Sequence, residues 1–268
     1  MDKQIIQGNL SPASRALIDD IQIFDEIDST NAESLRQIGS GKTGSWIVLA
    51  ESQSAGRGRR GRPWLSEKGA GIYLSMVRQF ELEADALQAL SLVTAISVQV
   101  ALSKLGVAGL QLKWPNDVLH QKMKLAGILL ELQHREQTLY VVFGIGINVA
   151  LSAELRLKID QPVTDLNELT GTIPNSNDIV AAVIDELCAN LQLFVRDGFV
   201  AFMDKWNELD CYRNSDIVVQ NADRRTIGRS LGVDESGALI VQSASGTQLI
   251  NGGEIFPSLR ESPDDPKS

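Results

Sequence analysis

A glycine-rich loop with four arginines is the part of this sequence best suited to chemistry. Residues 56–64 read Gly-Arg-Gly-Arg-Arg-Gly-Arg-Pro-Trp and follow the apolar run 46–50. Arginine offers a permanently charged fork that fits phosphate or carboxylate oxygens, and glycine lets backbone N–H groups approach the same anion. The preceding run predicts a buried strand, and open sheets bind ligands at strand ends. The pattern therefore indicates an anion site; a solvated basic loop or an Arg-Gly nucleic-acid contact stays open as the alternative.

Further polar clusters stand at predicted strand ends or helix starts. Ser29, Thr30 and Asn31 open a predicted helix, where such side chains either cap the helix or hold a polar head group. Lys113 lies in an alternating apolar run, where an unpaired ammonium is costly unless it faces an anion. Lys124 begins another apolar run and is either an edge lysine or a second cation of the site.

Composition narrows the class of ligand and the cellular setting. The 268 residues carry a net charge of −9, so the chain lacks the broad positive field of nucleic-acid binders, and a small anion is the expected target of the loop. Cys188 and Cys211 are the only cysteines and predict reduced thiols in a cytoplasmic protein. With His120 and His134 as the only histidines, no zinc site is expected. Neither a membrane-length apolar run nor a signal-peptide pattern is present in the sequence.

The elements that must position these residues mix helices and strands irregularly, which favours the α+β class. Helices are predicted over 13–19, 28–38, 84–105, 177–195 (capped by Asn177) and 199–209. Strands are predicted over 21–24, 46–50, 71–77, 110–114, 124–131 and 139–148. The 84–105 segment has the 3.6-residue apolar period of an amphipathic helix. Gly144 and Gly146 inside a strand predict a bulge or a closely approaching ligand.

The character of the chain changes after Cys211, where short β-type runs are punctuated by Gly and Asn. This pattern is typical of a small β-barrel. We therefore expect a mixed-sheet domain with helices packed on it over 1–210, a small β-barrel domain over 211–260, and a polar, disordered tail over 261–268.

Four segments together resemble the biotin–protein ligases. They read Gly-Arg-Gly-Arg-Arg-Gly-Arg-Pro-Trp (56–64), Lys-Trp-Pro-Asn-Asp (113–117), Lys-Leu-Ala-Gly-Ile-Leu-Leu-Glu (124–131) and Gly-Ile-Gly-Ile-Asn-Val (144–149), in the family's order and approximate spacing. The Asp-Ser-Thr-Asn run at 28–31 matches a further upstream motif, and the resemblance extends over about residues 21–260. It implies a ligase catalytic domain followed by an SH3-like domain.

The resemblance implies a reaction in two steps. The carboxylate of biotin attacks the α-phosphate of ATP, with Mg²⁺ present, and gives biotinyl-5′-adenylate and pyrophosphate. A lysine of the biotin carboxyl carrier domain of a carboxylase then attacks this mixed anhydride. Because a carboxylate that approaches a polyphosphate meets like-charge repulsion, cations must be in place before the transition state forms.

The resemblance also implies roles for individual residues. Lys124, Arg57 and Arg59 are the expected catalytic residues, with Lys124 between the biotin carboxylate and the α-phosphate. The expected biotin-binding residues are Ser29, Thr30, Asn31, Gln53, Gly56, Arg57, Gly58, Arg59, Lys124 and Gly127. The expected ATP- and adenylate-binding residues are Arg59, Arg60, Arg62, Trp64, Lys113, Asn116 and Asn148. No protein-bound metal centre is expected.

Longer members of the family carry an N-terminal DNA-binding winged helix. Only a short segment precedes the core here, so we expect a ligase without repressor function, nucleic-acid binding or membrane attachment, and a homodimer is compatible with the family. The nearest rival is a lipoate or octanoate ligase, which shares the fold and a corresponding lysine but lacks the Arg-Gly loop. A nucleic-acid-binding protein and an enzyme that hydrolyses an unrelated acyl-adenylate also stay open, although the acidic total argues against the former. The Phe-Pro step at 256–257 departs from the family's closing strand.

Overall fold

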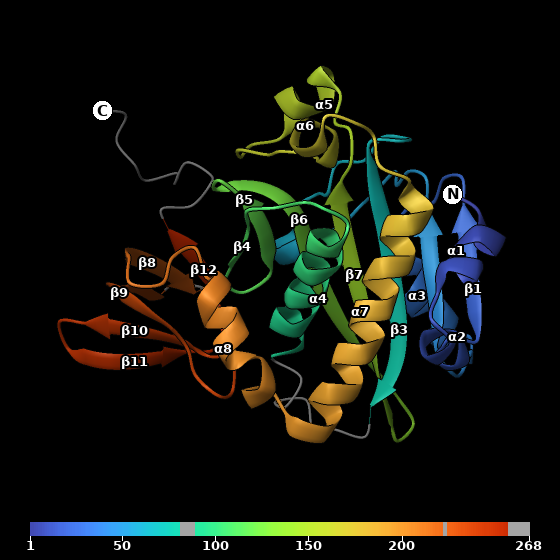
Figure 1. Cartoon of the computed structure of the whole chain (residues 1–268). Coiled ribbons are helices and arrows are strands. Elements are labelled where there is room, and N and C mark those ends of the chain that lie inside the picture. The colour runs from blue at the N-terminus through green and yellow to red at the C-terminus, as the bar shows by residue number, and fades with distance from the viewer. Residues whose placement is uncertain (81–88, 222–223, 257–268) are drawn as a thin grey trace.

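Two β-sheets organise the chain in the computed structural model, which describes residues 1–80, 89–221 and 224–256 (Figure 1). The larger sheet has seven strands in the order β1-β2-β3-β7-β6-β5-β4. Their bounds are β1 Asp20–Phe24, β2 Trp46–Ala50, β3 Gly71–Phe80, β4 Leu110–Lys113, β5 Asp117–His120, β6 Met123–Arg135 and β7 Thr138–Asn148. Only β1 and β2 pair in parallel, and the other neighbouring strands are antiparallel. The predicted mixed sheet is confirmed.

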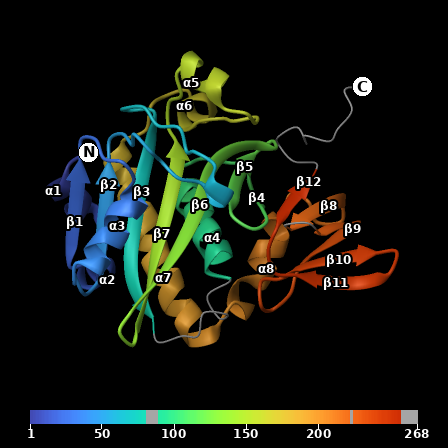
Figure 2. The same ribbon diagram turned by 180° about the vertical axis from the view of Figure 1, so that it is seen from behind.

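Helices cover both faces of this sheet. The helices α4 Leu90–Lys104 and α7 Ser176–Asp197 lie on one face, and α3 Thr30–Gly39 lies on the other (Figures 1 and 2). The remaining helices are α1 Lys3–Asn9, α2 Pro12–Leu17, α5 Ala153–Lys158, α6 Leu166–Thr170 and α8 Val200–Leu209. Among the described residues, no helix is both long and apolar enough to cross a membrane.

The expectation that the 84–105 helix is amphipathic was wrong for its described part. Eleven of the fifteen residues of α4 are buried, because the helix packs between the strands β4–β6, α7 and α8. A helix enclosed on all sides carries apolar residues all round rather than along one stripe. Residues 84–88 lie outside the described part of the chain.

Several boundaries also differ from the prediction. Asn175, rather than Asn177, caps α7, because its Oδ1 accepts a hydrogen bond of 2.9 Å from the Asn177 N–H. The strand β5 and the short helices α1, α5 and α6 were not predicted, since each is too brief to show a clear apolar period.

The second sheet is small and antiparallel (Figure 2). Its strands follow the order β11-β10-β9-β8-β12, with bounds β8 Asp216–Asn221, β9 Arg224–Val233, β10 Leu239–Ser243, β11 Gly246–Ile250 and β12 Glu254–Phe256. This arrangement confirms the α+β class with a small C-terminal β domain. Residues 257–260 of the expected closing strand and the tail 261–268 lie outside the described residues.

The apolar core is continuous across the predicted boundary near Asp210. Leu239 and Ile255 of the small sheet belong to the same buried cluster as Trp206 of α8 and Leu112 of β4. The division into domains at 210 and 211 therefore stays a prediction, because the two sheets share one core.

Asp210 itself is a buried carboxyl group at this junction. Its Oδ1 accepts a hydrogen bond of 2.9 Å from the Tyr212 N–H, while its Oδ2 is buried without a hydrogen-bond partner within the described ranges. Burial raises the pKa of Asp210 to about 6. The ionised carboxylate is thus disfavoured in the folded state.

We expect Asp210→Asn to stabilise the protein at pH 8 and to lose this advantage toward pH 4. The folded-state pKa lies above the unfolded value of 3.8, so the wild type loses stability as pH rises from about 4 to about 6, at a cost of roughly 3 kcal/mol. Urea unfolding from pH 4 to pH 8 measures the difference. A wild type and variant with parallel pH profiles would contradict the raised pKa.

Candidate active site

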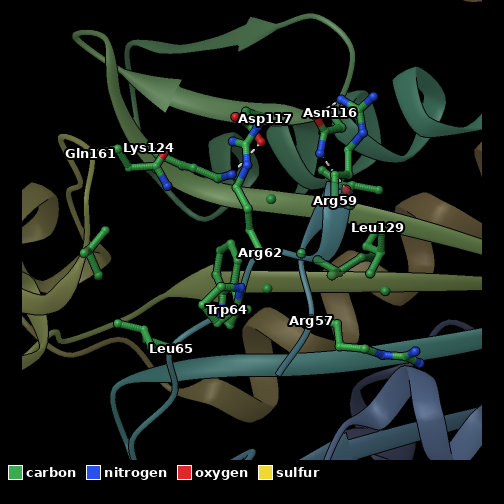
Figure 3. A pocket seen from close by; sticks show the side chains of 18 of the residues that line it. Arg57, Arg59, Arg62, Trp64, Leu65, Asn116, Asp117, Lys124, Leu129 and Gln161 are labelled. Atoms are coloured by element: carbon green, nitrogen blue, oxygen red, sulfur yellow. Dashed lines mark hydrogen bonds and ion pairs between the residues drawn. The ribbon is translucent and has the colours of Figure 1, made fainter. Parts of the chain in front are cut away.

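One cavity of about 290 Å³ opens on the α3 side of the large sheet (Figure 3). The N-terminus of α3, the arginine loop, and strands β4 to β7 contribute to its wall. The following residues predicted from the sequence line it: Ser29, Thr30, Asn31, Gln53, Arg57, Gly58, Arg59, Arg60, Arg62, Trp64, Lys113, Asn116, Lys124, Gly127 and Asn148. Segments that are distant in the sequence therefore meet in one place.

Glycines on two neighbouring strands form the floor of this cavity. Gly127 of β6 lies opposite Gly146 of β7. A Cβ added to Gly146 would lie 2.6 Å from the ring of Trp64, and one added to Gly144 would lie 2.3 Å from Asn31 Oδ1. Side chains at these positions would push the covering groups away, so the glycines permit a close approach to the backbone.

A hydrogen-bonded group of polar side chains occupies one end of the cavity. The N–H and Oγ1 of Thr30 donate to Gln53 Oε1 at 2.8 and 3.2 Å. Asn31 Nδ2 donates to Glu131 Oε2 at 2.8 Å, and Asn31 Oδ1 accepts from Ser75 Oγ at 2.5 Å. These bonds fix the rotamers of the group, so its orientation is set before any ligand binds. Ser29 precedes it as the N-cap of α3.

The arginine loop sends its side chains in different directions. Arg57 donates to Glu131 Oε2 at 3.2 Å and points away from Lys124 (Figure 3). Arg59 is largely buried and donates to Asn116 Oδ1 at 3.1 Å and to the Gly253 carbonyl at 3.3 Å. Burial lowers the pKa of Arg59, although a guanidinium stays protonated at neutral pH.

The remaining two arginines bind the small sheet. Arg60, with a positive φ of 57°, donates to the Gln220 carbonyl at 2.9 Å. Both terminal nitrogens of Arg62 pair with the carboxylate of Glu254 on β12. Together with the bond from Arg59 to Gly253, these contacts tie the loop to strands β8 and β12 and the turn before β12.

Two lysines lie near one carboxylate at the other end of the cavity. Lys124 Nζ lies 2.7 Å from Asp117 Oδ1 and 5.5 Å from the centroid of the Trp64 ring (Figure 3). Lys113 is buried, with its Nζ 5.7 Å from the centroid of the Tyr212 ring. Burial lowers the pKa of Lys113, and Asp117 opposes that shift. Cations outnumber carboxylates along the cavity wall, so the cavity favours an anionic ligand.

Comparisons with known proteins agree on a single family. The model of the biotin/lipoate A/B protein ligase family matches residues 23–148, and that of the biotin protein ligase C-terminal domain matches residues 217–256. The chain is 39% identical to the bifunctional ligase/repressor BirA of Escherichia coli over 90% of this chain and 74% of that protein. It is 34% identical to the biotin–[acetyl-CoA-carboxylase] ligase of Paracoccus denitrificans over 85% and 97%. The chain belongs to the biotin protein ligase family.

A solved structure supports the same assignment. The biotin protein ligase of Aquifex aeolicus, determined in complex with biotin and ATP, matches with a TM-score of 0.75 and 29% identity, over 89% of this chain and 98% of that one. The recognition of the family from sequence motifs is thereby confirmed, and the seven-stranded sheet with its C-terminal β domain is the family's fold.

Gly56 is the one predicted biotin-binding residue of this ligase that does not line the cavity. Its carbonyl accepts from the Trp64 N–H at 2.9 Å, and an added Cβ would lie 2.4 Å from the Trp64 carbonyl oxygen. Gly56 therefore closes the base of the arginine loop. The assignments of single residues to biotin or ATP stay predictions.

The sequence reasoning missed several residues of the cavity wall. Asp117 stood inside the recognised 113–117 motif but was given no role, although a carboxylate between two lysines is a usable signal. Glu254 lies far along the chain and has no motif that links it to the loop. Lys158, Asp160 and Gln161, which follow or end α5, had no recognisable pattern either.

We expect Gly146→Ala to lower the rate of adenylate formation by about tenfold or more, because the new methyl group must displace the Trp64 ring from the cavity floor. Steady-state kinetics with varied ATP measure the effect. Gly8→Ala in α1 is the matched control, since nothing lies within 4 Å of an added Cβ there. Unchanged kinetics in Gly146→Ala would show that the position of Trp64 on the floor does not matter.

We expect Glu254→Gln to increase the rate of tryptic cleavage within residues 57–62 several-fold, because it removes the two-pronged, charge-assisted pair with Arg62. Timed proteolysis followed by mass spectrometry measures the cleavage. Glu186→Gln is the control, since it breaks an ion pair with Lys104 that is remote from the loop. Equal cleavage in both variants would mean that the small sheet does not hold the loop.

Proposed function

We propose that this protein is an ATP-dependent biotin–protein ligase that forms biotinyl-5′-adenylate and transfers biotin to a lysine of a carboxylase biotin-carrier domain. The observation that carries the proposal is the joining, in one cavity, of a fixed polar slot and a cluster of buried cations. The slot, built by Thr30, Asn31 and Gln53, fits an uncharged polar ring, and the cations fit phosphates.

The first step needs a carboxylate and a triphosphate to meet. Lys124 is the proposed catalytic cation, because it lines the cavity beside Trp64 and Asp117 and its ammonium can neutralise charge on both reactants. Arg59 and Lys113 add positive charge on the phosphate side. When the carboxylate oxygen bonds to the α-phosphorus, the bond to the bridging oxygen breaks and pyrophosphate leaves with its electron pair.

Magnesium enters this scheme as the partner of ATP. The described residues hold no group of three or more His, Cys, Asp or Glu that could bind a metal by itself. The carboxylate of Asp117 lines the cavity beside the side chain of Asn116, and Mg²⁺ commonly combines one or two protein oxygens with phosphates and waters. Bound there, Mg²⁺ would neutralise phosphate charge.

The second step requires that water be kept from a hydrolysable anhydride. The arginine loop and Trp64 cover the floor of the cavity, and the loop is braced against the small sheet through Arg60 and Arg62. We infer that Arg57, which points away from Lys124 in this structure (Figure 3), turns toward it when an adenylate is present. Such a cover excludes water until the acceptor lysine arrives.

The proposal also includes a cytoplasmic location, a homodimer and the absence of nucleic-acid binding. The free thiols Cys188 and Cys211 support a cytoplasmic location. Strand β1 lies at the edge of the large sheet, which supports a homodimer that pairs across this edge. The net charge of −9 supports the absence of nucleic-acid binding.

The decisive measurement is pyrophosphate release from ATP and Mg²⁺, with biotin or lipoate supplied separately. We expect release with biotin alone, and transfer to a purified carrier domain afterwards. Release with lipoate alone would show that biotin is not the substrate, although adenylate formation would remain the reaction. Release with neither compound would refute the proposed ligase activity.

Lys124→Ala should lower the biotin-dependent rate by about a thousandfold while leaving the thermal midpoint within a few degrees, because the lost ammonium acts on charge in the transition state. The same pyrophosphate assay and a thermal melt measure the two effects. A wild-type rate in that variant would exclude Lys124 as the catalytic cation.

A further inference from the structure

The strand that carries Lys124 contains an irregularity at that residue. Between β5 and β6, Asp117 pairs with Gly127 and Val118 with Ala126, but Leu119 pairs with Lys124. One residue of β6, Leu125, is therefore extra, which is the definition of a β-bulge. Leu125 and Ala126 are both buried in the same apolar core, although neighbouring residues of a regular strand point to opposite faces.

The bulge decides on which face of the sheet Lys124 emerges. Lys124 and Gly127 are three residues apart, so a regular strand would place them on opposite faces. Because the bulge shifts the register by one residue, Lys124 lies on the same face of the sheet as Gly127 and Asp117, which is the face of the cavity. In a regular register the ammonium would point into the apolar core under α4, where an unpaired charge is costly.

The backbone of the bulge is held from the side by a segment that follows β7 in the chain. The Lys124 N–H donates to the Pro162 carbonyl at 3.0 Å, and the Lys124 carbonyl accepts from the Thr164 N–H at 3.1 Å. These bonds form a short parallel bridge between Lys124 and Val163. They satisfy backbone groups that a regular ladder would have paired elsewhere.

Asn148 joins the two segments. This buried side chain uses Nδ2 to donate to the Lys124 carbonyl at 3.2 Å and to the Thr164 carbonyl at 3.0 Å. An amide nitrogen has two hydrogens, so both are used in the protein. The remaining polar atom of the side chain, Oδ1, can only accept a hydrogen bond.

We propose that Asn148 is a positioning residue for Lys124, and that its side chain locks the β-bulge that turns the ammonium of Lys124 toward the cavity. The proposal rests on the proposed function insofar as Lys124 acts on the reactants. It differs from the prediction of a simple adenylate ligand, because the amide acts through the backbone of Lys124 before any ligand binds.

The test uses Asn148→Ala and Asn148→Asp in the full-length protein. Without ligand, hydrogen exchange followed by mass spectrometry should show the Lys124 amide exchanging about tenfold faster or more in both variants. Biotin-dependent pyrophosphate exchange should show kcat reduced by about tenfold to a hundredfold. Asn148→Asp keeps the shape of the side chain and its Oδ1, but it places an acceptor opposite the carbonyls of Lys124 and Thr164. It therefore distinguishes loss of these two backbone bonds from loss of a ligand contact. It also keeps the test possible if Asn148→Ala does not fold.

Asn207→Ala is the matched control. Asn207 also binds backbone groups, at the junction of α8 and β9: its Nδ2 donates to the Val233 carbonyl at 3.3 Å and its Oδ1 accepts from the Val233 N–H at 2.9 Å. It should leave kcat and the exchange of the Lys124 amide at wild-type values, although it removes a comparable pair of bonds.

Two results would overturn the proposal. One is a raised KM for ATP in Asn148→Ala with unchanged kcat and unchanged exchange at Lys124, which indicates a ligand contact alone. The other is Asn148→Asp with wild-type kcat and exchange. If the proposed function is wrong, the wild-type protein will show no biotin-dependent pyrophosphate exchange. The hydrogen exchange of the Lys124 amide would still decide whether Asn148 holds the bulge.

Discussion

The structure depends on holding several cations close together in a cavity that is largely removed from water. Arg59, Lys113 and Lys124 lie around the carboxylate of Asp117. Buried like charges repel one another and lose hydration, so such a group persists only where the surrounding framework is rigid. That cost becomes useful when a carboxylate and a polyphosphate must be brought into contact, because the positive charge is already in place.

This rigidity comes from residues that take no part in the reaction. The glycines of β6 and β7 let Trp64 and Asn31 lie directly on the sheet. The arginine loop, which glycine makes flexible, gains fixed points from Asn116 on the large sheet and from Glu254 on the small one. Since the two sheets share one apolar core, the small sheet is part of the scaffold of the site.

The segment after β7 contributes to the site through its backbone, which hydrogen-bonds to Lys124. Residues 162–164 have no catalytic side chain, yet their N–H and C=O groups bind the backbone of Lys124. The same region brings Lys158 and Gln161 to the cavity wall. A stretch without any motif can thus be essential, because a bulge leaves backbone groups that something else must satisfy.

The family and the mixed class of the fold could be predicted from the amino-acid sequence, and every predicted site residue except Gly56 lines the cavity, although these residues make up only about half of its wall. This was possible because the arginine loop, the 113–117 turn and the glycines of β7 are local patterns whose chemistry shows in residue types and spacing. The role of Glu254, the enclosure of α4 and the clamp by Asn148 emerged only from the folded chain. These depend on contacts between distant segments, and on a one-residue change of register whose effect on the direction of Lys124 is visible only once the strands are paired.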